Sequence, residues 1–186
     1  MPEGINEAAL KAAVVDHTSF EDLPEISCRL DLFLENTKQM AQDGCDEEWR
    51  MQYDALDNLR VLNKHNPSEL QLAHFTRFIS DQVENLRSNN SRNALTLVYE
   101  IFSRPEGKKQ MMALFVNDIL PVVLNKTASE KSFISSVAKR AVTSAAEACP
   151  KHVTCNVLLS GVESKNISLA EFSIHSIWVL VQKTDF

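Results

Sequence analysis

Apolar residues recur along most of this chain at steps of three and four, the spacing that places them on one face of an α-helix. After residue 48 the apolar positions are Trp49, Tyr53, Leu56, Leu59 and Leu62. Comparable stripes follow in Leu72, Phe75, Ile79, Val83 and Leu86, in Ala94, Leu97, Val98, Ile101 and Phe102, and within residues 108–124, 132–148, 153–162 and 167–181. The pattern predicts a chain built almost wholly from amphipathic helices.

Helix-breaking and capping residues divide the stripes into pairs. We expect Pro24 to open the first long helix and Gly44 to end it, and the acidic run 46–48 to begin its partner. The later pairs are separated from one another at Asn66–Glu69, Pro105–Gly107 and Pro150, and the two helices inside each pair are separated at Ser88–Ser91, Lys126–Glu130 and Glu163–Asn166. Helix–loop–helix units therefore start near residues 24, 66, 107 and 150.

The spacing of these units is roughly 40 residues, which is typical of HEAT and armadillo repeats. One such unit cannot bury its own apolar face, but stacked units share a continuous core. We therefore predict an all-α solenoid of four helical hairpins over residues 24–186, preceded by an extension, residues 1–23, with a short helix at 5–15. A four-helix bundle with extra helices is the competing architecture.

Composition supports helices. The 186 residues include only 4 glycines and 6 prolines, fewer than the tight turns of an all-β fold would need, while 44% are hydrophobic, enough for a core. The net charge of −6 disfavours general nucleic-acid binding. The start of the chain lacks a signal-peptide pattern and no apolar run is long enough to span a bilayer, so we expect an intracellular, cytoplasmic protein with reduced thiols and no membrane contact.

The sequence contains no recognisable catalytic or metal-binding motif. The five histidines show no catalytic spacing to an acid, and no phosphate-cradling glycine loop is present, so we expect neither an enzyme nor a cofactor. Cys149, His152 and Cys155 lie close together, but C-x₅-C is not the spacing of a zinc knuckle. Two thiols buried beside a helix turn are the better interpretation, and no metal site is predicted.

Trp49 has two possible roles. In one, Trp49 is the first buried residue of the apolar stripe of its helix. In the other, its position at the very start of the helix leaves it partly exposed, where it can anchor a partner. The later turns within each pair carry small polar and basic residues: Arg87 to Arg92, Ser129 to Lys131, and Ser164 to Asn166. Turns of this kind line up along one edge of a solenoid, which would present one indole and several cations.

The sequence resembles a TOG domain, in particular the type found at the N-terminus of the CLASP family. The resemblance rests on the run Asp46 to Arg50 leading into Ala55 to Leu59, on Val83 to Ser88 followed by Arg92 to Ala94, and on Ser164 to Asn166 before a helix. It covers about residues 24–183. Four of the six repeats of a full TOG domain are visible here.

TOG domains bind the tubulin heterodimer through the edge formed by the loops inside their repeats. The resemblance therefore implies a partner, tubulin or the microtubule, and a place on the cytoskeleton, in a cilium or at a centrosome. It implies the following contact residues: Trp49 and Arg50 at the first loop, Asn89 and Arg92 at the second, Lys131 at the third, and Lys165 and Asn166 at the fourth.

Two alternatives remain open from the sequence. The chain could instead be a HEAT or armadillo scaffold that binds a helix or peptide of another protein, with Trp49 buried. At the C-terminal end, Ile174, Ile177 and Trp178 form an apolar face that would be left uncovered after four repeats. Such a face predicts either further repeats, a partner chain or a homodimer.

Overall fold

The computed structural model describes residues 18–26, 28–42, 49–104 and 109–182. Within these ranges the chain forms α-helices and two short 3₁₀ turns. Their bounds are η1 (Phe20–Asp22), α2 (Leu30–Gln42), α3 (Trp49–His65), η2 (Pro67–Glu69), α4 (Leu72–Glu84), α5 (Ser88–Ser103), α6 (Lys109–Lys126), α7 (Ser132–Ala148), α8 (Lys151–Val162) and α9 (Ile167–Gln182).

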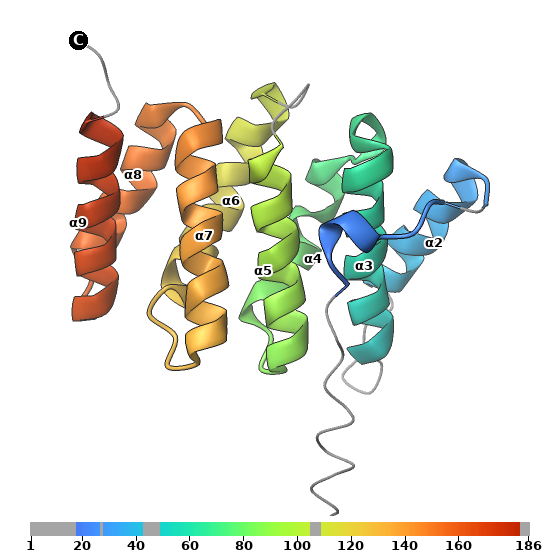
Figure 1. The fold of residues 1–186 in the computed structure, drawn as a ribbon, viewed down its shortest axis with the longest axis horizontal. Helices are drawn as coiled ribbons and strands as arrows, with labels where there is room; N and C mark the ends of the chain where they lie inside the picture. The colour runs from blue at the N-terminus through green and yellow to red at the C-terminus, as the bar shows by residue number, and fades with distance from the viewer. Residues whose placement is uncertain (1–17, 27, 43–48, 105–108, 183–186) are drawn as a thin grey trace, which may run out of the picture.

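The helices stack side by side in two layers. One layer contains α3, α5, α7 and α9, and the other contains α2, α4, α6 and α8 (Figure 1). Each hairpin contributes one helix to each layer, and successive hairpins lie next to each other along the long axis. This is the predicted all-α, HEAT-like solenoid rather than a closed bundle, and the hairpin pairing is the one expected from the sequence.

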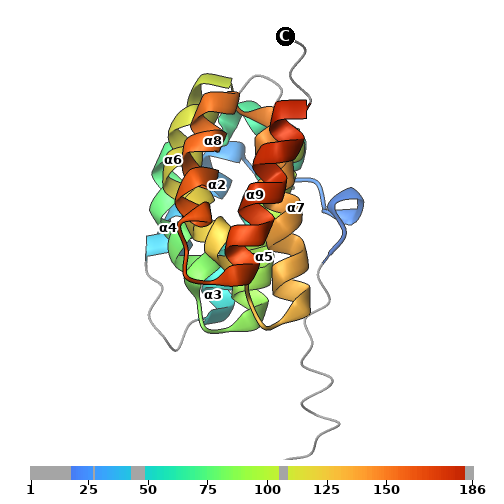
Figure 2. The same cartoon turned by 90° about the vertical axis from the view of Figure 1, so that its left-hand side faces the viewer.

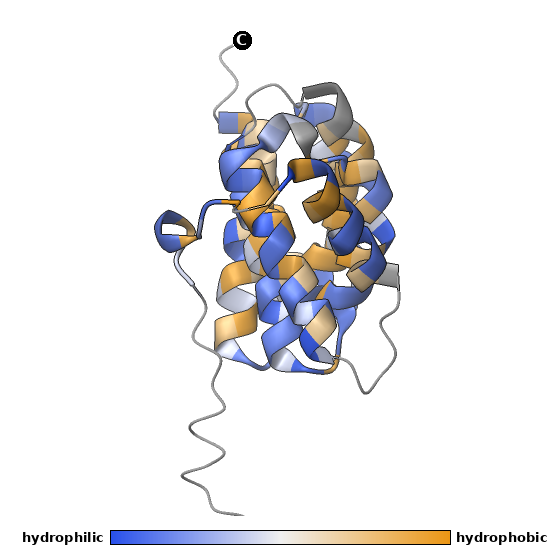
Figure 3. Ribbon diagram, turned by 90° about the vertical axis from the view of Figure 1, so that its right-hand side faces the viewer, coloured by the Kyte–Doolittle hydropathy of each residue, from blue (hydrophilic) through white to orange (hydrophobic). Residues whose placement is uncertain are grey.

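The core lies between the two layers. Seen from the end formed by α2 and α3, much of the apolar ribbon faces the space between the layers (Figure 3). All the apolar positions predicted from the stripe of α5 are buried there, as are Phe75 and Ile79 of α4 and Phe115 of α6. The rings of Phe102 and Phe115 lie 5.8 Å apart and join the second hairpin to the third.

The first hairpin begins later than predicted. Residues 23–26 and 28–29 are not helical, and α2 starts at Leu30 rather than near Pro24. The reason lies in α3, because Lys64 Nζ donates to the carbonyls of Glu21 at 2.6 Å and Leu23 at 3.1 Å. The side chain of Lys64 thus occupies the carbonyl of Leu23, which would have accepted the first backbone bond of a helix opening at Pro24. Residues 18–23, which we call the strap, lie across α3 and α5.

The second hairpin also begins later than expected. Residues Pro67–Glu69 form a 3₁₀ turn, and α4 starts only at Leu72. Leu70, which lies between these two elements, is buried in the core. The 3₁₀ turn and α4 therefore do not form one continuous helix. The start of α7, the end of α8 and the start of α9 fall where the sequence predicted them. The predicted helix at 5–15, the Gly44 cap and the acidic run 46–48 lie outside the described residues.

Candidate turn edge

The described turns inside the hairpins lie at one end of the molecule. They are residues 85–87, 127–131 and 163–166, and α3 begins at the same end (Figure 1). We use "turn edge" for the first turn of α3 (Trp49 and Arg50) together with residues 84–92, 126–133 and 163–166. The alignment predicted for these turns is therefore observed for the three that the structure describes.

Trp49 is half-buried at the start of α3, between two guanidinium groups. Arg50 Cζ lies 5.5 Å and Arg87 Cζ lies 5.6 Å from the centre of its ring. Arg87 belongs to the second turn, so the indole also links the first hairpin to the second. Cations at this distance from a ring face are attracted by its quadrupole, which orients the indole at the edge. The fully buried alternative for Trp49 is not what the structure shows.

The second turn is shorter than predicted, because Ser88–Ser91 form the first turn of α5 rather than a break. Two of these side chains, Asn90 and Ser91, are buried and bond to neighbouring helices. Buried Ser91 donates from Oγ to the carbonyl of Val83 at 2.8 Å. Buried Asn90 donates from Nδ2 to the carbonyl of Trp49 at 3.2 Å and to Gln82 Oε1 at 3.1 Å. These bonds fix the turn against α3.

Leu86 contradicts the sequence prediction. It was expected to continue the buried stripe of α4, yet it is 96% exposed, in the middle of the second turn. The helix ends at Glu84, so the three-and-four spacing no longer sets the direction of the side chain at position 86. A leucine that projects fully into water next to Arg87 is a candidate contact residue that the sequence did not indicate. Asn85 Oδ1 accepts a hydrogen bond from the backbone N–H of Arg87 at 2.9 Å. A bond of this kind is typical of a local turn.

The third turn is joined to the second by side chains. Lys131 Nζ donates to Ser88 Oγ at 2.5 Å, and Arg92 Cζ lies 6.0 Å from the ring centre of the exposed Phe133. Between the two turns the surface is hollowed to about 270 Å³, and its lining includes Leu86, Lys131 and Ile134. The edge therefore offers a shallow recess of mainly polar lining, in which Leu86 and Ile134 supply the apolar area and both acidic and basic side chains are present.

The fourth turn carries Lys165 and Asn166, both exposed. Asn166 has a structural role as well, because its Oδ1 accepts from the backbone N–H of Leu169 at 3.2 Å and so caps the start of α9. Its own backbone N–H donates to Ser164 Oγ at 3.1 Å. Lys165 is the cation that this turn presents to solvent.

The described residues of the turn edge carry a net positive charge, whereas the whole chain carries a net negative charge. Of its residues six are basic and three are acidic, although the chain as a whole carries a net charge of −6. The basic ones are Arg50, Arg87, Arg92, Lys126, Lys131 and Lys165; the acidic ones are Glu84, Glu130 and Glu163. Asn89, the remaining predicted contact residue, is half-buried beside them. Residues 43–48, which join α2 to α3, add four acidic residues to the sequence of this edge, so the positive charge belongs to the three described turns, and it is there that an acidic surface would be attracted.

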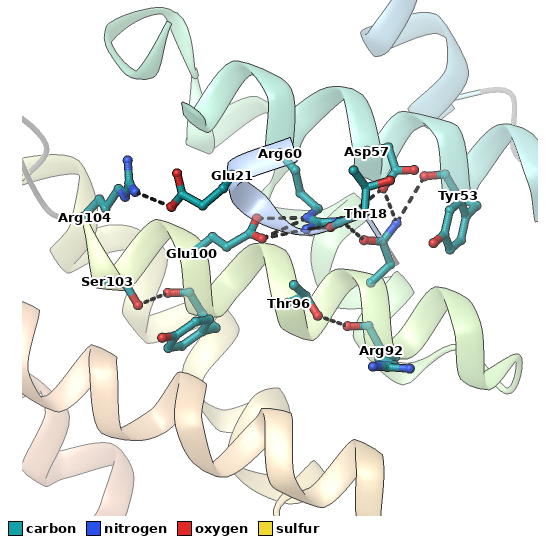
Figure 4. Close-up of polar contacts among 12 residues, drawn as sticks. Thr18, Glu21, Tyr53, Asp57, Arg60, Arg92, Thr96, Glu100, Ser103 and Arg104 are labelled. Atoms are coloured by element: carbon teal, nitrogen blue, oxygen red, sulfur yellow. Dashed lines mark hydrogen bonds and ion pairs between the residues drawn. The ribbon is translucent and has the colours of Figure 1, made fainter. Parts of the chain in front are cut away.

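A buried ion pair holds α3 and α5 together behind the edge. Arg60 of α3 is 1% exposed and donates from Nη2 to Glu100 Oε1 of α5 at 2.7 Å (Figure 4). It also contacts Asp57 at 3.4 Å and donates to Asn93 Oδ1 at 3.3 Å. Burial raises the pKa of Glu100, and the hydrogen bonds from Arg60 oppose that shift. The pair ties the first hairpin to the second in one relative position.

The described cysteines, Cys28, Cys149 and Cys155, lie in no cluster of possible metal ligands. In the part of the chain that the structure describes, no three His, Cys, Asp or Glu side chains gather as metal ligands would. Cys149 is buried as predicted, and burial raises its pKa to about 11, while Cys155 is half-buried and Cys28 exposed. Cys45 lies outside the described residues. None of the described helices is long and apolar enough to cross a membrane.

A two-layered stack of helical hairpins with one aligned row of turns defines a HEAT-like binding domain. The model of the CLASP N-terminal family matches residues 41–185 of the chain. The chain therefore belongs to that family, and the TOG-like assignment predicted from its sequence is confirmed. The family consists of non-enzymatic helical binding domains associated in general with microtubules. No individual curated protein matches the chain.

Proposed function

We propose that this domain binds the tubulin heterodimer or the microtubule through the turn edge. The observation that supports this most directly is Trp49, half-buried between Arg50 and Arg87, together with the fully exposed Leu86. An aromatic side chain with its orientation fixed before binding loses little entropy on association, and such residues are frequent binding hot spots. Membership of the CLASP N-terminal family points to tubulin as the partner.

The contact residues that we propose fall into two groups. Trp49 and Leu86 supply apolar area that leaves water on binding. Arg50, Arg92, Lys131 and Lys165 supply positive charge toward an acidic partner, while Asn89 and Asn166 offer polar contacts. Because Arg50, Lys131 and Lys165 are exposed, their attraction is screened by salt, and binding weakens as ionic strength rises. The same proposal places the chain on the cytoskeleton, with a cilium or a centrosome as specific sites.

Co-elution with purified tubulin at low salt tests this proposal. We expect the wild-type chain to shift the elution of tubulin, and Trp49→Glu to weaken binding by about 30-fold or more, as truncation of a hot-spot residue does. Lys131→Glu should weaken it by about 10-fold and flatten the salt dependence. Arg77→Glu is the matched control, because Arg77 is almost fully exposed on α4, away from the turns, and the charge change is the same.

Two results would contradict the proposal. One is a wild-type chain that never shifts tubulin, even at low salt. The other is a loss of binding that is equal for Arg77→Glu and Lys131→Glu, since that would reflect total charge rather than the edge.

A scaffold that binds a helix or peptide of another protein is the second candidate function. It is favoured by a groove of about 410 Å³ between α7 and α9, whose lining includes Ala146, Phe172, Val179 and Leu180. The groove is separate from the turn edge. Phe172→Glu would therefore abolish peptide binding in this groove and leave tubulin binding unchanged.

A further inference from the structure

The outer side of α5 and α7 carries a group of positive side chains in the middle of the stack. Looking along the solenoid, the strap lies on the outer side of the layer that contains these two helices (Figure 2). Hairpins stacked onto either end of the solenoid would continue the two layers and leave this side open. We call the following exposed or half-buried residues the lateral face: Tyr99, Ser103 and Arg104 at the end of α5, and Lys139, Arg140 and Ser144 in α7.

Two guanidinium groups of the lateral face lie over aromatic rings. Arg104 Cζ lies 4.3 Å from the ring centre of Phe20 in the strap, and Arg140 Cζ lies 4.2 Å from the ring centre of Tyr99. A ring attracts a cation through its quadrupole but carries no net charge. The rings therefore orient both guanidinium groups without cancelling their charge.

The carboxylates of the same two helices lie elsewhere. In α5 the acidic residue is Glu100, which is buried against Arg60, and in α7 it is Glu147, about two helical turns beyond Arg140. Lys139 is exposed next to Arg140. In the part of the chain that the structure describes, neither of these two cations forms an ion pair with Asp or Glu.

The strap shows which kind of segment this side of the domain holds. Glu21 of the strap pairs with Arg104 at 3.3 Å, while the ring of the preceding Phe20 lies against the same guanidinium (Figure 4 shows the ion pair). A short acidic segment outside the α-helices thus supplies both the carboxylate and the ring. Arg140 has the corresponding ring, that of Tyr99, and lacks the carboxylate among the described residues.

The two guanidinium groups belong to one continuous surface. Ser103, which directly precedes Arg104, has its Oγ 3.3 Å from Oγ of Ser144. Ser144 lies on α7 one helical turn after Arg140. The position of Arg140 is therefore next to the part of the surface that already holds an acidic segment.

The surrounding charge favours a narrow partner over a broad anionic surface. The chain carries a net charge of −6, and exposed carboxylates such as Glu21 and Glu147 lie on the same side of the domain. Exposed charges are screened beyond about 10 Å at 0.1 M salt. A single peptide strand can contact Arg140 and Lys139 and avoid most of these carboxylates, whereas a bilayer or a nucleic-acid duplex would approach them as well.

We propose that the lateral face binds an extended acidic peptide of a partner protein beside the strap, with carboxylates of the peptide on Arg140 and Lys139. The planar fork of a guanidinium donates to both oxygens of a carboxylate, and the ammonium adds a second positive charge. The proposal goes beyond the turn edge and does not rest on tubulin binding, since no residue of the lateral face belongs to that edge.

The first test is the fluorescence anisotropy of a labelled synthetic peptide mixed with the full chain at low salt. The peptide has about eight residues, glutamate alternating with glycine, and covers about 26 Å when extended. We expect it to bind, and a matched peptide with glutamine in place of glutamate to bind at least about tenfold more weakly.

Charge reversal on the chain identifies the surface that binds. Arg140→Glu should weaken peptide binding at least about tenfold, and Lys139→Glu should weaken it as well. Arg77→Glu is the control, because it makes the same charge change at an exposed position of α4, in the other layer. A wild-type chain that binds neither peptide overturns the proposal. Equal binding of the two peptides, or equal losses in Arg140→Glu and Arg77→Glu, does so too.

The second test separates the other occupants. Neutralising the acidic residues of the N-terminal extension in the full chain (Glu3→Gln, Glu7→Gln and Asp16→Asn) should leave the affinity for the peptide unchanged. A gain of about tenfold or more would assign the lateral face to the chain's own extension and overturn the proposal.

Two further results would also overturn it. One is sedimentation of the chain with vesicles of phosphatidylcholine and phosphatidylserine that Arg140→Glu abolishes, without binding of the peptide. The other is a loss of peptide binding in Trp49→Glu as large as that in Arg140→Glu, since this would place the peptide on the turn edge.

Discussion

Among single residues, the smallest side chains set how closely the last two helices approach. Gly161 of α8 is buried, and a Cβ added there would lie 2.2 Å from Ser173 Oγ and 3.0 Å from Leu124 Cδ2. Ser173 of α9 is fully buried and donates from Oγ to the carbonyl of Leu169 at 2.8 Å. The crossing of α8 and α9 therefore depends on having no side chain at position 161.

Gly161→Ala should lower the free energy of unfolding by about 2 kcal/mol, because an extra methyl in a packed crossing forces its neighbours to move. Ser173→Ala in the same chain should recover part of the loss by removing the nearest atom. Chemical denaturation measures both, with the neighbouring exposed Ser160→Ala as a control. Full stability in Gly161→Ala would mean that the crossing is looser than described.

The two tyrosines of the chain differ in their surroundings. Burial, helped by the carboxylate of Asp57, raises the pKa of Tyr53 to about 12. The hydrogen bond from Arg140 lowers the pKa of Tyr99 from its ordinary value of 10.0. Because the folded pKa of Tyr53 exceeds the unfolded one, its contribution to stability is complete below pH 10 and is lost as the pH rises toward about 12.

The ultraviolet absorbance of phenolate should therefore rise in two steps during an alkaline titration. Tyr99 ionises first, and Tyr53 follows near the onset of unfolding. Tyr53→Phe should remove the later step alone and leave the first one in place. Simultaneous titration of both residues near pH 10 would show that Tyr53 is not buried as described.

At the scale of elements, the strap (residues 18–23) fastens the first two hairpins from outside. Arg60 Nη2 donates to the carbonyl of Thr18 at 2.7 Å, and Leu23 is buried. Arg104, the residue directly after α5, pairs with Glu21 at 3.3 Å and lies 4.3 Å over the ring of Phe20 (Figure 4 shows the Glu21 contact). Without the strap, one donor of a buried guanidinium would have no carbonyl partner.

Deletion of residues 1–23 should lower the free energy of unfolding by about 3 kcal/mol, from the lost burial of Leu23 and the unpaired donor of Arg60. Deletion of residues 1–17 is the matched control, since it keeps every strap contact named here. Thermal and denaturant unfolding compare the two. Equal stability of the two deletions would assign the strap no part in the fold.

For the whole molecule, the sequence predicted the architecture because helical periodicity survives in every hairpin. Residues such as Leu97, Val98 and Ile101 face the core wherever the backbone is helical, and the period of the hairpins then determines how they stack. Trp49 and the cations of the described turns were also predicted to lie along one edge, as they do (Figure 1), since hairpins stacked in register must align their turns.

The errors arose where tertiary contacts replace local signals. Ser88–Ser91 resembled a loop, yet Asn90 and Ser91 are polar because they satisfy buried groups of other helices. Pro24 resembled a helix start, yet the carbonyl of Leu23, just before it, is taken by Lys64 and His65 of α3. Leu86 resembled a core residue because its helix ends two residues earlier than the spacing suggested. None of these partners is close in sequence, so local pattern alone does not indicate them.

The interior bridge between Arg60 and Glu100 has a consequence for any protein that docks on this domain. Because it locks α3 to α5, the indole at the head of one helix and the leucine just before the other stay a constant distance apart. Trp49 and Leu86 therefore form a rigid pair of contacts. A docking surface whose curvature does not match their separation has to change its own shape to contact both residues at once.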